Sequence, residues 1–117
     1  MGVDYSVAVL YGFEIDMPSV MQYCYDAGID FYELKERICE ESNCEITLDN
    51  LYCEPQDARG FFGVSILNRI TAETLAEIER DRQEEVCDTF IQYFGSYDFL
   101  CEDQGCEPEI QVTGVIW

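Results

Sequence analysis

The sequence contains no histidine and only six lysine and arginine residues, against 25 aspartate and glutamate residues. The absence of histidine removes the Ser-His and Cys-His nucleophile pairs, the usual general base near neutral pH and most catalytic zinc sites. Neither GxxxxGK[ST] nor GxGxxG occurs, and "GFFG" at 60–63 is read as a hairpin rather than a phosphate loop. A carboxylate pair could support glycosidase-like chemistry, but among 25 acids such a pair arises by chance. We therefore expect a protein that is not an enzyme.

Long apolar runs and targeting signals are also missing. No segment approaches the roughly 18 apolar residues of a membrane span. The alternating start MGVDYSVAVLYGFEID lacks the basic region of a signal peptide. The seven cysteines are an odd number. With no secretory signal, we expect reduced thiols and a cytoplasmic location, in the host cytoplasm if the protein is viral.

Negative charge dominates what is present. The formal net charge is −19 for 117 residues, of which 48% are hydrophobic and 14% aromatic. That hydrophobic content can form the core of one domain covering residues 1–117, and it excludes an acidic disordered tail. The charge opposes direct binding to nucleic acid or to an anionic membrane, because phosphates would be repelled. It favours a basic protein surface as the partner.

Hydrophobic periodicity predicts four strands and three helices. Alternation indicates strands over 3–13, 45–53, 61–69 and 110–117. Cap and breaker residues indicate helices from Asp16 to Gly28, from Asp30 to Glu41 and from Thr71 to Phe94. The β-α-α-β-β-α-β order predicts an α+β fold with a ferredoxin-like (split βαβ) antiparallel sheet and its helices on one face.

The helix predicted after Thr71 carries seven carboxylates and two arginines between residues 73 and 88. At 100° per residue, a stripe of acids about 80° wide lies roughly opposite the apolar residues Leu75, Ile78, Val86 and Phe90. Like charges at i,i+4 destabilise an isolated helix by about 0.2–0.5 kcal/mol per pair. The acids of this stripe are Glu73, Glu77, Asp81, Glu84 and Asp88.

A charged stripe is usually a solvated helix face, but ordinary exposed helices mix charges of both signs. This stripe contains no lysine, and further acids fill the predicted loops. We therefore predict that the stripe binds a partner. Exposed aromatics beside acids would suit an arginine-rich partner through cation–π contacts, which makes Tyr97 and Phe99 further candidates, although the segment 93–100 is more typical of core.

Two alternatives remain open. The first is a self-associating interaction module, a monomer or small homo-oligomer in which acidity serves solubility and the segment 93–100 forms the seam. The second is a four-cysteine zinc module, because Cys39-x4-Cys44 and Cys101-x4-Cys106 have equal spacing. Structural zinc pairs usually have two intervening residues, so these four cysteines are weak metal candidates. We expect no cofactor.

No family motif is present, but by composition the chain is similar to the small acidic nucleic-acid mimics that phages make against restriction or CRISPR systems. That likeness implies a viral inhibitor of a host defence or nucleic-acid-binding protein. Such an inhibitor would act by nucleic-acid mimicry or by blocking a basic site. This is our leading hypothesis from the sequence.

Overall fold

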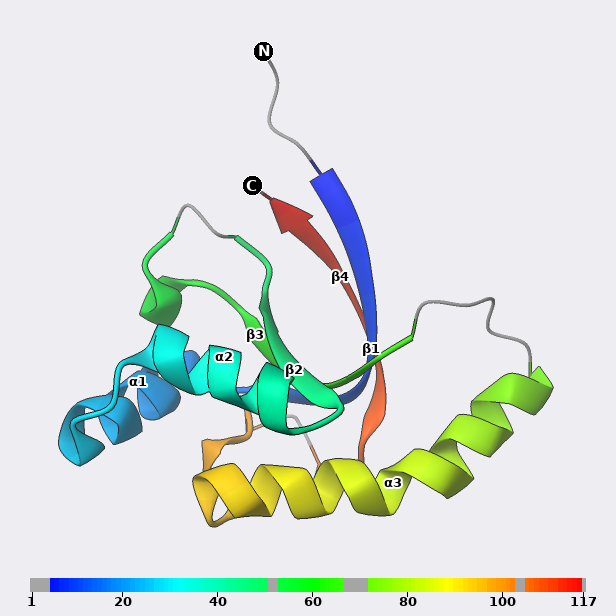
Figure 1. Cartoon of the computed structure of the whole chain (residues 1–117). Coiled ribbons are helices and arrows are strands. Elements are labelled where there is room, and N and C mark those ends of the chain that lie inside the picture. The colour runs from blue at the N-terminus through cyan, green and yellow to red at the C-terminus, as the bar shows by residue number, and fades with distance from the viewer. Residues whose placement is uncertain (1–4, 51–52, 67–71, 103–104, 117) are drawn as a thin grey trace.

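The computed structural model describes residues 5–50, 53–66, 72–102 and 105–116, and at 5–8, 72–75, 78–79 and 113–116 it describes the backbone alone. Within these ranges three α-helices accompany a four-stranded antiparallel sheet, so the predicted α+β class is confirmed (Figure 1). In chain order the elements are β1 (Tyr5–Ile15), α1 (Met17–Ala27), α2 (Phe31–Glu41), β2 (Cys44–Leu48), the 3-10 turn η1 (Pro55–Asp57), β3 (Gly60–Ser65), α3 (Ala72–Phe94), the 3-10 turn η2 (Tyr97–Phe99) and β4 (Glu109–Ile116).

Local sequence sets the helix boundaries. The Asp30 carboxylate accepts a hydrogen bond of 3.1 Å from the Tyr32 N–H and so caps the first turn of α2. Gly28 follows α1 with a φ of 68°, and Gly95 follows α3 with a φ of 80°. Glycine adopts this left-handed conformation without the steric penalty that a Cβ imposes. These boundaries confirm the sequence prediction.

The sheet has the spatial order β2-β3-β1-β4. β1 lies in the centre, and its two neighbours cover different parts of it. β3 pairs with residues 10–15 of β1, whereas β4 pairs with residues 5–12. β2 pairs only with β3 among the described strands. The first half of β1 therefore has β4 as its one strand partner within the described chain.

One face of the sheet forms the core with all three helices. Strand residues alternate, so every second side chain in residues 11–15 of β1 and in β2 and β3 points toward the helices. Phe90 of α3 lies against this face, with ring centroids 5.3 Å from Phe13 and 5.2 Å from Phe62. The buried strand residues are Tyr11, Phe13, Ile15, Cys44, Ile46, Leu48, Phe62 and Val64, and the buried helix residues are Met17, Val20, Cys24, Phe31, Leu34, Ile38, Val86, Phe90 and Phe94.

Gly12 and Gly63 face each other across the β1–β3 pair. A Cβ at Gly12 would collide with the Phe62 carbonyl, and a Cβ at Gly63 would collide with the Tyr11 carbonyl. Only glycine permits this close approach of two backbones. The approach lies in the part of β1 that the helices cover.

Several predicted boundaries and burials differ from the structure. β2 ends at Leu48 rather than at 53, because Asp49 turns the chain and its carboxylate accepts a hydrogen bond from the Arg59 N–H at 2.9 Å. The GFFG sequence lies inside β3, so its prediction as a hairpin is wrong. Period-2 alternation from Val3 to Phe13 predicts that Leu10 lies on the polar face of its strand, yet it is fully buried. Thr71, the predicted cap of α3, lies outside the described residues.

Candidate functional site

The second half of α3 anchors the helix to the core. Val86, Phe90 and Phe94 follow one another at intervals of four residues and are all buried. This spacing places them on one side of the helix. Phe90 and Phe94 also contact each other, with ring centroids 4.8 Å apart. The prediction that Val86 and Phe90 lie opposite the acidic stripe agrees with this burial. The side chains of Leu75 and Ile78, which the sequence predicts on the same side, lie outside the described set.

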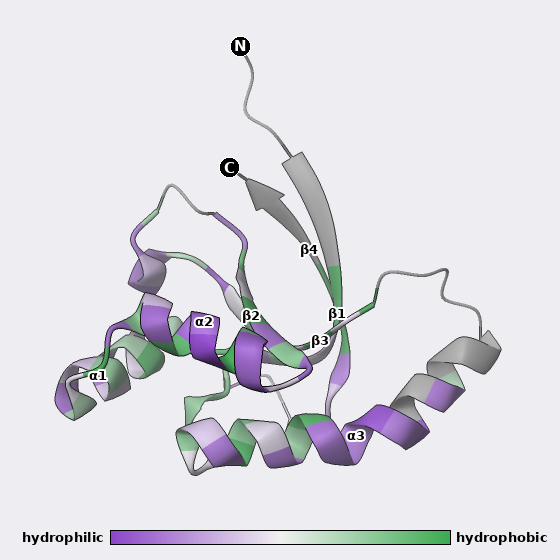
Figure 2. Ribbon diagram, in the orientation of Figure 1, coloured by the Kyte–Doolittle hydropathy of each residue, from purple (hydrophilic) through white to green (hydrophobic). Residues whose placement is uncertain are grey.

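The first half of α3 carries the acids away from that core. Every side chain described between residues 76 and 84 is exposed. In Figure 1 this part of the helix extends beyond the sheet, and Figure 2 colours the middle of α3 as strongly hydrophilic. The exposed acids Glu77, Asp81, Glu84 and Asp88 form what we call the carboxylate face. Glu73 also belongs to α3, but its side chain lies outside the described set.

Arg80, one of the two arginines of α3, pairs with one acid of the carboxylate face. Arg80 Nε lies 3.2 Å from Asp81 Oδ1, and both side chains are largely exposed. An exposed ion pair of this kind contributes little, typically about 0.2–1 kcal/mol. Within the described residues, no basic side chain pairs with Glu77, Glu84 or Asp88. Asp81 therefore differs from the other members of the carboxylate face.

Glu85 marks the point where the two halves of α3 meet. Its carboxylate accepts a hydrogen bond of 2.9 Å from Asn43 Nδ2, which lies between α2 and β2. Arg82 Nη1 lies 2.7 Å from the other oxygen, Oε2. The bond from Asn43 and then the Arg82 guanidinium lower the pKa of Glu85. Glu85 thus links α3 to the α2–β2 connection.

Tyr97 and Phe99, the aromatic candidates for partner binding, lie half-buried against the core. The Tyr97 ring stacks on Phe90 at a centroid distance of 5.8 Å, and Phe99 packs on Tyr23 at 5.2 Å. These contacts agree with the core interpretation of the segment 93–100. The structure instead exposes Tyr25 of α1 and Tyr32 of α2, which the sequence analysis did not select. Each of these tyrosines lies close to an end of its helix, and this position is the sequence feature that could have suggested its exposure.

The four candidate zinc ligands occupy different environments. Cys44 lies in the core, where burial raises the pKa of its thiol to about 11 despite a hydrogen bond with Thr89. Cys101 lies beside Glu14, and burial followed by repulsion from that carboxylate raises its pKa to about 11. Cys39 and Cys106 are exposed. Among the described residues, no three His, Cys, Asp or Glu side chains gather where a metal ion could be held.

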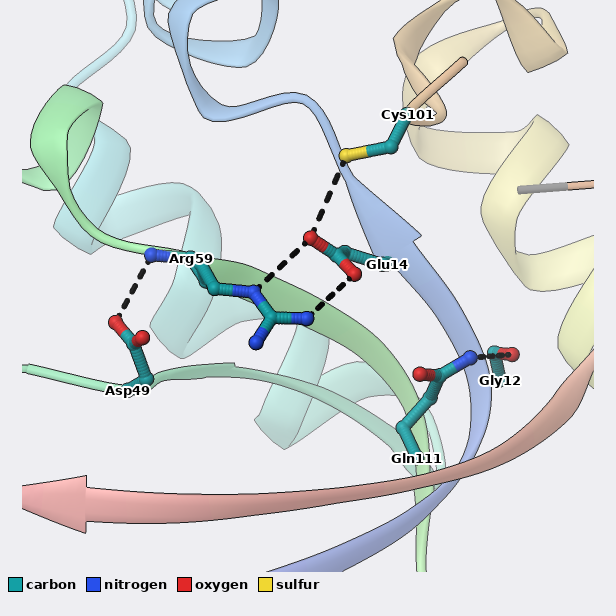
Figure 3. A network of polar contacts seen from close by, with 6 residues as sticks. All are labelled: Gly12, Glu14, Asp49, Arg59, Cys101 and Gln111. Atoms are coloured by element: carbon teal, nitrogen blue, oxygen red, sulfur yellow. Dashed lines mark hydrogen bonds and ion pairs between the residues drawn. The ribbon is translucent and has the colours of Figure 1, made fainter. Parts of the chain in front are cut away.

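A polar network at the end of β1 was not predicted from the sequence (Figure 3). Arg59 donates two hydrogen bonds to Glu14, from Nη2 at 2.8 Å and from Nε at 3.2 Å. The Cys101 thiol donates to the same carboxylate at 3.7 Å, and the Arg59 guanidinium lies 5.3 Å from the centre of the Phe61 ring. Because Glu14 and Arg59 are 45 residues apart, no local pattern connects them. The network ties β1 and β3 to the segment after η2.

Comparisons of the chain with protein-family models, with curated proteins and with solved structures found no match. Among the described helices, none combines the length and the apolar character needed to cross a membrane.

Proposed function

We propose that this chain is a small acidic binding protein whose carboxylate face binds a basic surface of a partner protein. In its narrowest form, the proposal is that a phage uses the chain against a host defence or other nucleic-acid-binding protein. The chain would occupy the site that normally holds nucleic acid. The observation that carries the proposal is the exposure of Glu77, Asp81 and Glu84 in residues 76–84, where every described side chain is exposed, together with the exposure of Asp88 between the buried Val86 and Phe90.

The spacing of the acids supports a role as phosphate surrogates. Neighbouring members of the carboxylate face are three or four residues apart, which corresponds to about 4.5–6 Å along a helix. Phosphates of one DNA strand recur every 3.4 Å along the duplex axis. The helix therefore presents fewer charges per unit length than DNA does. Exposed acids of the segment that follows α3, such as Asp98 and Glu102, would supplement it.

Charge balance along α3 supports the same partner chemistry. Residues 77–88 contain six carboxylates and two arginines. The Arg80–Asp81 pair is exposed, so a lysine or arginine of the partner could replace Arg80 at small energetic expense. A charged surface of this kind accelerates association with an oppositely charged site and makes binding sensitive to salt.

We also propose that the fold is the ferredoxin-like, split βαβ arrangement expected from the sequence. The order β2-β3-β1-β4 and the two connections that carry helices, β1-α1-α2-β2 and β3-α3-β4, support this assignment. The division of the first crossover into two helices at Gly28 is the main departure from a single helix. A fold of this kind hosts many functions, so the assignment adds nothing to the choice of partner.

A triple substitution tests the proposed surface. Glu77→Gln, Asp81→Asn and Glu84→Gln remove three charges from α3, and Glu33→Gln, Glu36→Gln and Glu40→Gln remove three from exposed positions of α2 as the matched control. Each immobilised protein is incubated with nuclease-treated host lysate, washed at low and high salt, and eluted with duplex DNA. We expect wild type and control to retain DNA-displaceable proteins at low salt, and the α3 variant to lose them, mainly through slower association.

The outcome that contradicts the proposal is equally specific. If the α2 and α3 variants lose the same proteins to the same degree, overall acidity rather than the carboxylate face explains capture. If duplex DNA displaces no captured protein, nucleic-acid mimicry is wrong. Circular dichroism and thermal melts establish that both variants remain folded.

A further inference from the structure

The first half of β1 and the second half of β4 form a two-stranded ribbon, which we call the terminal ribbon and define as residues 5–9 and 112–116. Tyr5 pairs with Ile116, and Val9 pairs with Val112. Pairing with β3 begins only at Leu10, although the Ile66 N–H donates a hydrogen bond to the Val9 carbonyl at 2.8 Å. In Figure 1 the ribbon rises away from the helices. Among the described residues, it thus lacks the helical layer that covers the rest of the sheet.

The chemistry of the ribbon contrasts with that of the whole chain. None of its ten residues is charged at neutral pH, in a protein with a net charge of −19. Edge strands of monomeric proteins commonly carry charged residues, which discourage pairing with another chain. β2, the opposite edge strand, follows this rule with Glu45 at its second position. In β4 the one charged residue is Glu109, at its first position.

The ribbon is also incomplete as a folded unit. An isolated two-stranded ribbon is marginally stable in water, and a third strand or a covering helix is normally required. Val112, the ribbon residue of β4 whose side chain is described, is 65% exposed. Within the described chain β4 pairs with β1 alone, so its outer edge faces no strand. β4 has the composition of a central strand in the position of an edge strand.

We propose that two copies of this chain pair through the outer edges of β4, in antiparallel orientation, to form one sheet that continues across both protomers. Antiparallel pairing places the two Glu109 residues at opposite ends of the seam, so no like charges meet along it. A basic foreign partner would be attracted to the carboxylate face rather than to an uncharged edge. A second copy supplies an edge that is equally uncharged and whose backbone donors and acceptors are complementary to it.

The response to salt distinguishes dimerisation through β4 from binding of a basic partner to the carboxylate face. Two chains of charge −19 repel each other, and added salt screens that repulsion. Dimerisation should therefore strengthen with salt, whereas binding of a basic partner to the carboxylate face should weaken. The inference does not depend on the proposed function, and each can fail while the other holds.

Sedimentation velocity and light scattering across protein concentration measure the association directly. We expect the wild-type chain to form dimers whose dissociation constant falls between low salt and about 1 M salt, where the Debye length is about 3 Å. Val112→Glu adds two like charges beside the seam and should weaken the dimer by about tenfold or more. Tyr25→Glu makes the same charge change at an exposed site on α1 and should leave the dimer unchanged.

Amide hydrogen exchange provides a measurement on the wild-type chain, which remains informative if Val112→Glu does not fold. Exchange in residues 112–116 should slow as protein concentration rises, while exchange in α1 should not change. A wild-type chain that stays monomeric at every salt and protein concentration overturns the proposal, including when a foreign strand is found on β4. A dimer that Val112→Glu and Tyr25→Glu weaken equally also overturns it.

Discussion

The two halves of α3 separate packing from charge within one helix. Residues 86–94 place Val86, Phe90 and Phe94 in the core, whereas the described side chains of residues 76–84 are all exposed. Most helical stability in proteins comes from tertiary packing of an apolar face. The exposed half can therefore carry repelling carboxylates because the buried half holds the helix on the sheet. A surface of this kind can vary in charge without disturbing the core.

The largest effect should come from the buried half. Phe90→Ala removes a ring that lies among Phe13, Phe62, Phe94 and Tyr97. Truncation of a buried phenylalanine typically lowers the free energy of unfolding by about 3–5 kcal/mol, because apolar contacts are lost and a cavity remains. Denaturant unfolding of the purified variant measures the change.

The neighbouring residue is the control for that substitution. Ile91 is 37% exposed on the same turn of α3, and Ile91→Ala should lower the free energy of unfolding by less than about 1 kcal/mol. Equal losses for the two variants would show that the second half of α3 does not pack on the sheet as described.

Gly95→Ala should have the next largest effect, at the end of the buried half. The φ of 80° at Gly95 is strained for any residue with a Cβ, although nothing else lies within 4 Å of that position. Left-handed backbone costs a non-glycine residue about 1–2 kcal/mol. Thermal melts should show destabilisation of this size, and a variant as stable as wild type would mean that α3 ends differently in solution.

The sequence could predict this arrangement only in part. The period of 3.6 placed Val86 and Phe90 opposite the acids, and glycine chemistry located the helix ends near Gly28 and Gly95. Periodicity identifies the apolar side of a helix, but it does not say how far along that side a sheet extends. The exposure of the side chains described in residues 76–84 depends on where the sheet lies relative to α3, which is a tertiary property.

Two other features escaped the sequence for related reasons. Period-2 alternation assigns one apolar face to a strand, so it placed Leu10 among the polar residues, whereas the fold buries it. The Glu14–Arg59 contact joins the end of β1 to the residue before β3, and local patterns contain no information on such distant pairs. The aromatic segment 93–100 could be recognised as core-like but not excluded as a surface, because composition alone fits both.

A glycine in the exposed half tests whether the two halves unfold together. Ala76→Gly lowers helix stability by about 0.5–1 kcal/mol where the helix is formed. If the exposed half opens locally, this change should accelerate amide exchange in residues 76–84 and leave global unfolding almost unaffected. The two readouts are hydrogen exchange and denaturant unfolding. If the whole penalty of about 0.5–1 kcal/mol appeared in the free energy of global unfolding, α3 would behave as one cooperative unit.

The smallest effect concerns Glu85, where the halves meet. Glu85→Gln retains a hydrogen-bond acceptor for Asn43 but removes the charge that pairs with Arg82 at 2.7 Å. A pair of this kind at i,i+3 contributes about 0.2–0.5 kcal/mol. Glu84→Gln, which removes a neighbouring exposed charge with no ion pair in the described chain, is the control and should not destabilise the fold.

The pH dependence distinguishes this ion pair from a general effect of charge. Because the pKa of Glu85 is lowered in the folded chain, its contribution is present above the unfolded value of about 4.3 and is lost as pH falls through the folded pKa. The difference in Tm between wild type and Glu85→Gln should therefore be largest near neutral pH and disappear in acid. A difference that persists below the folded pKa would mean that Glu85 stabilises the junction through packing or neutral hydrogen bonds. The two halves of α3 would then be coupled by contacts that do not depend on charge.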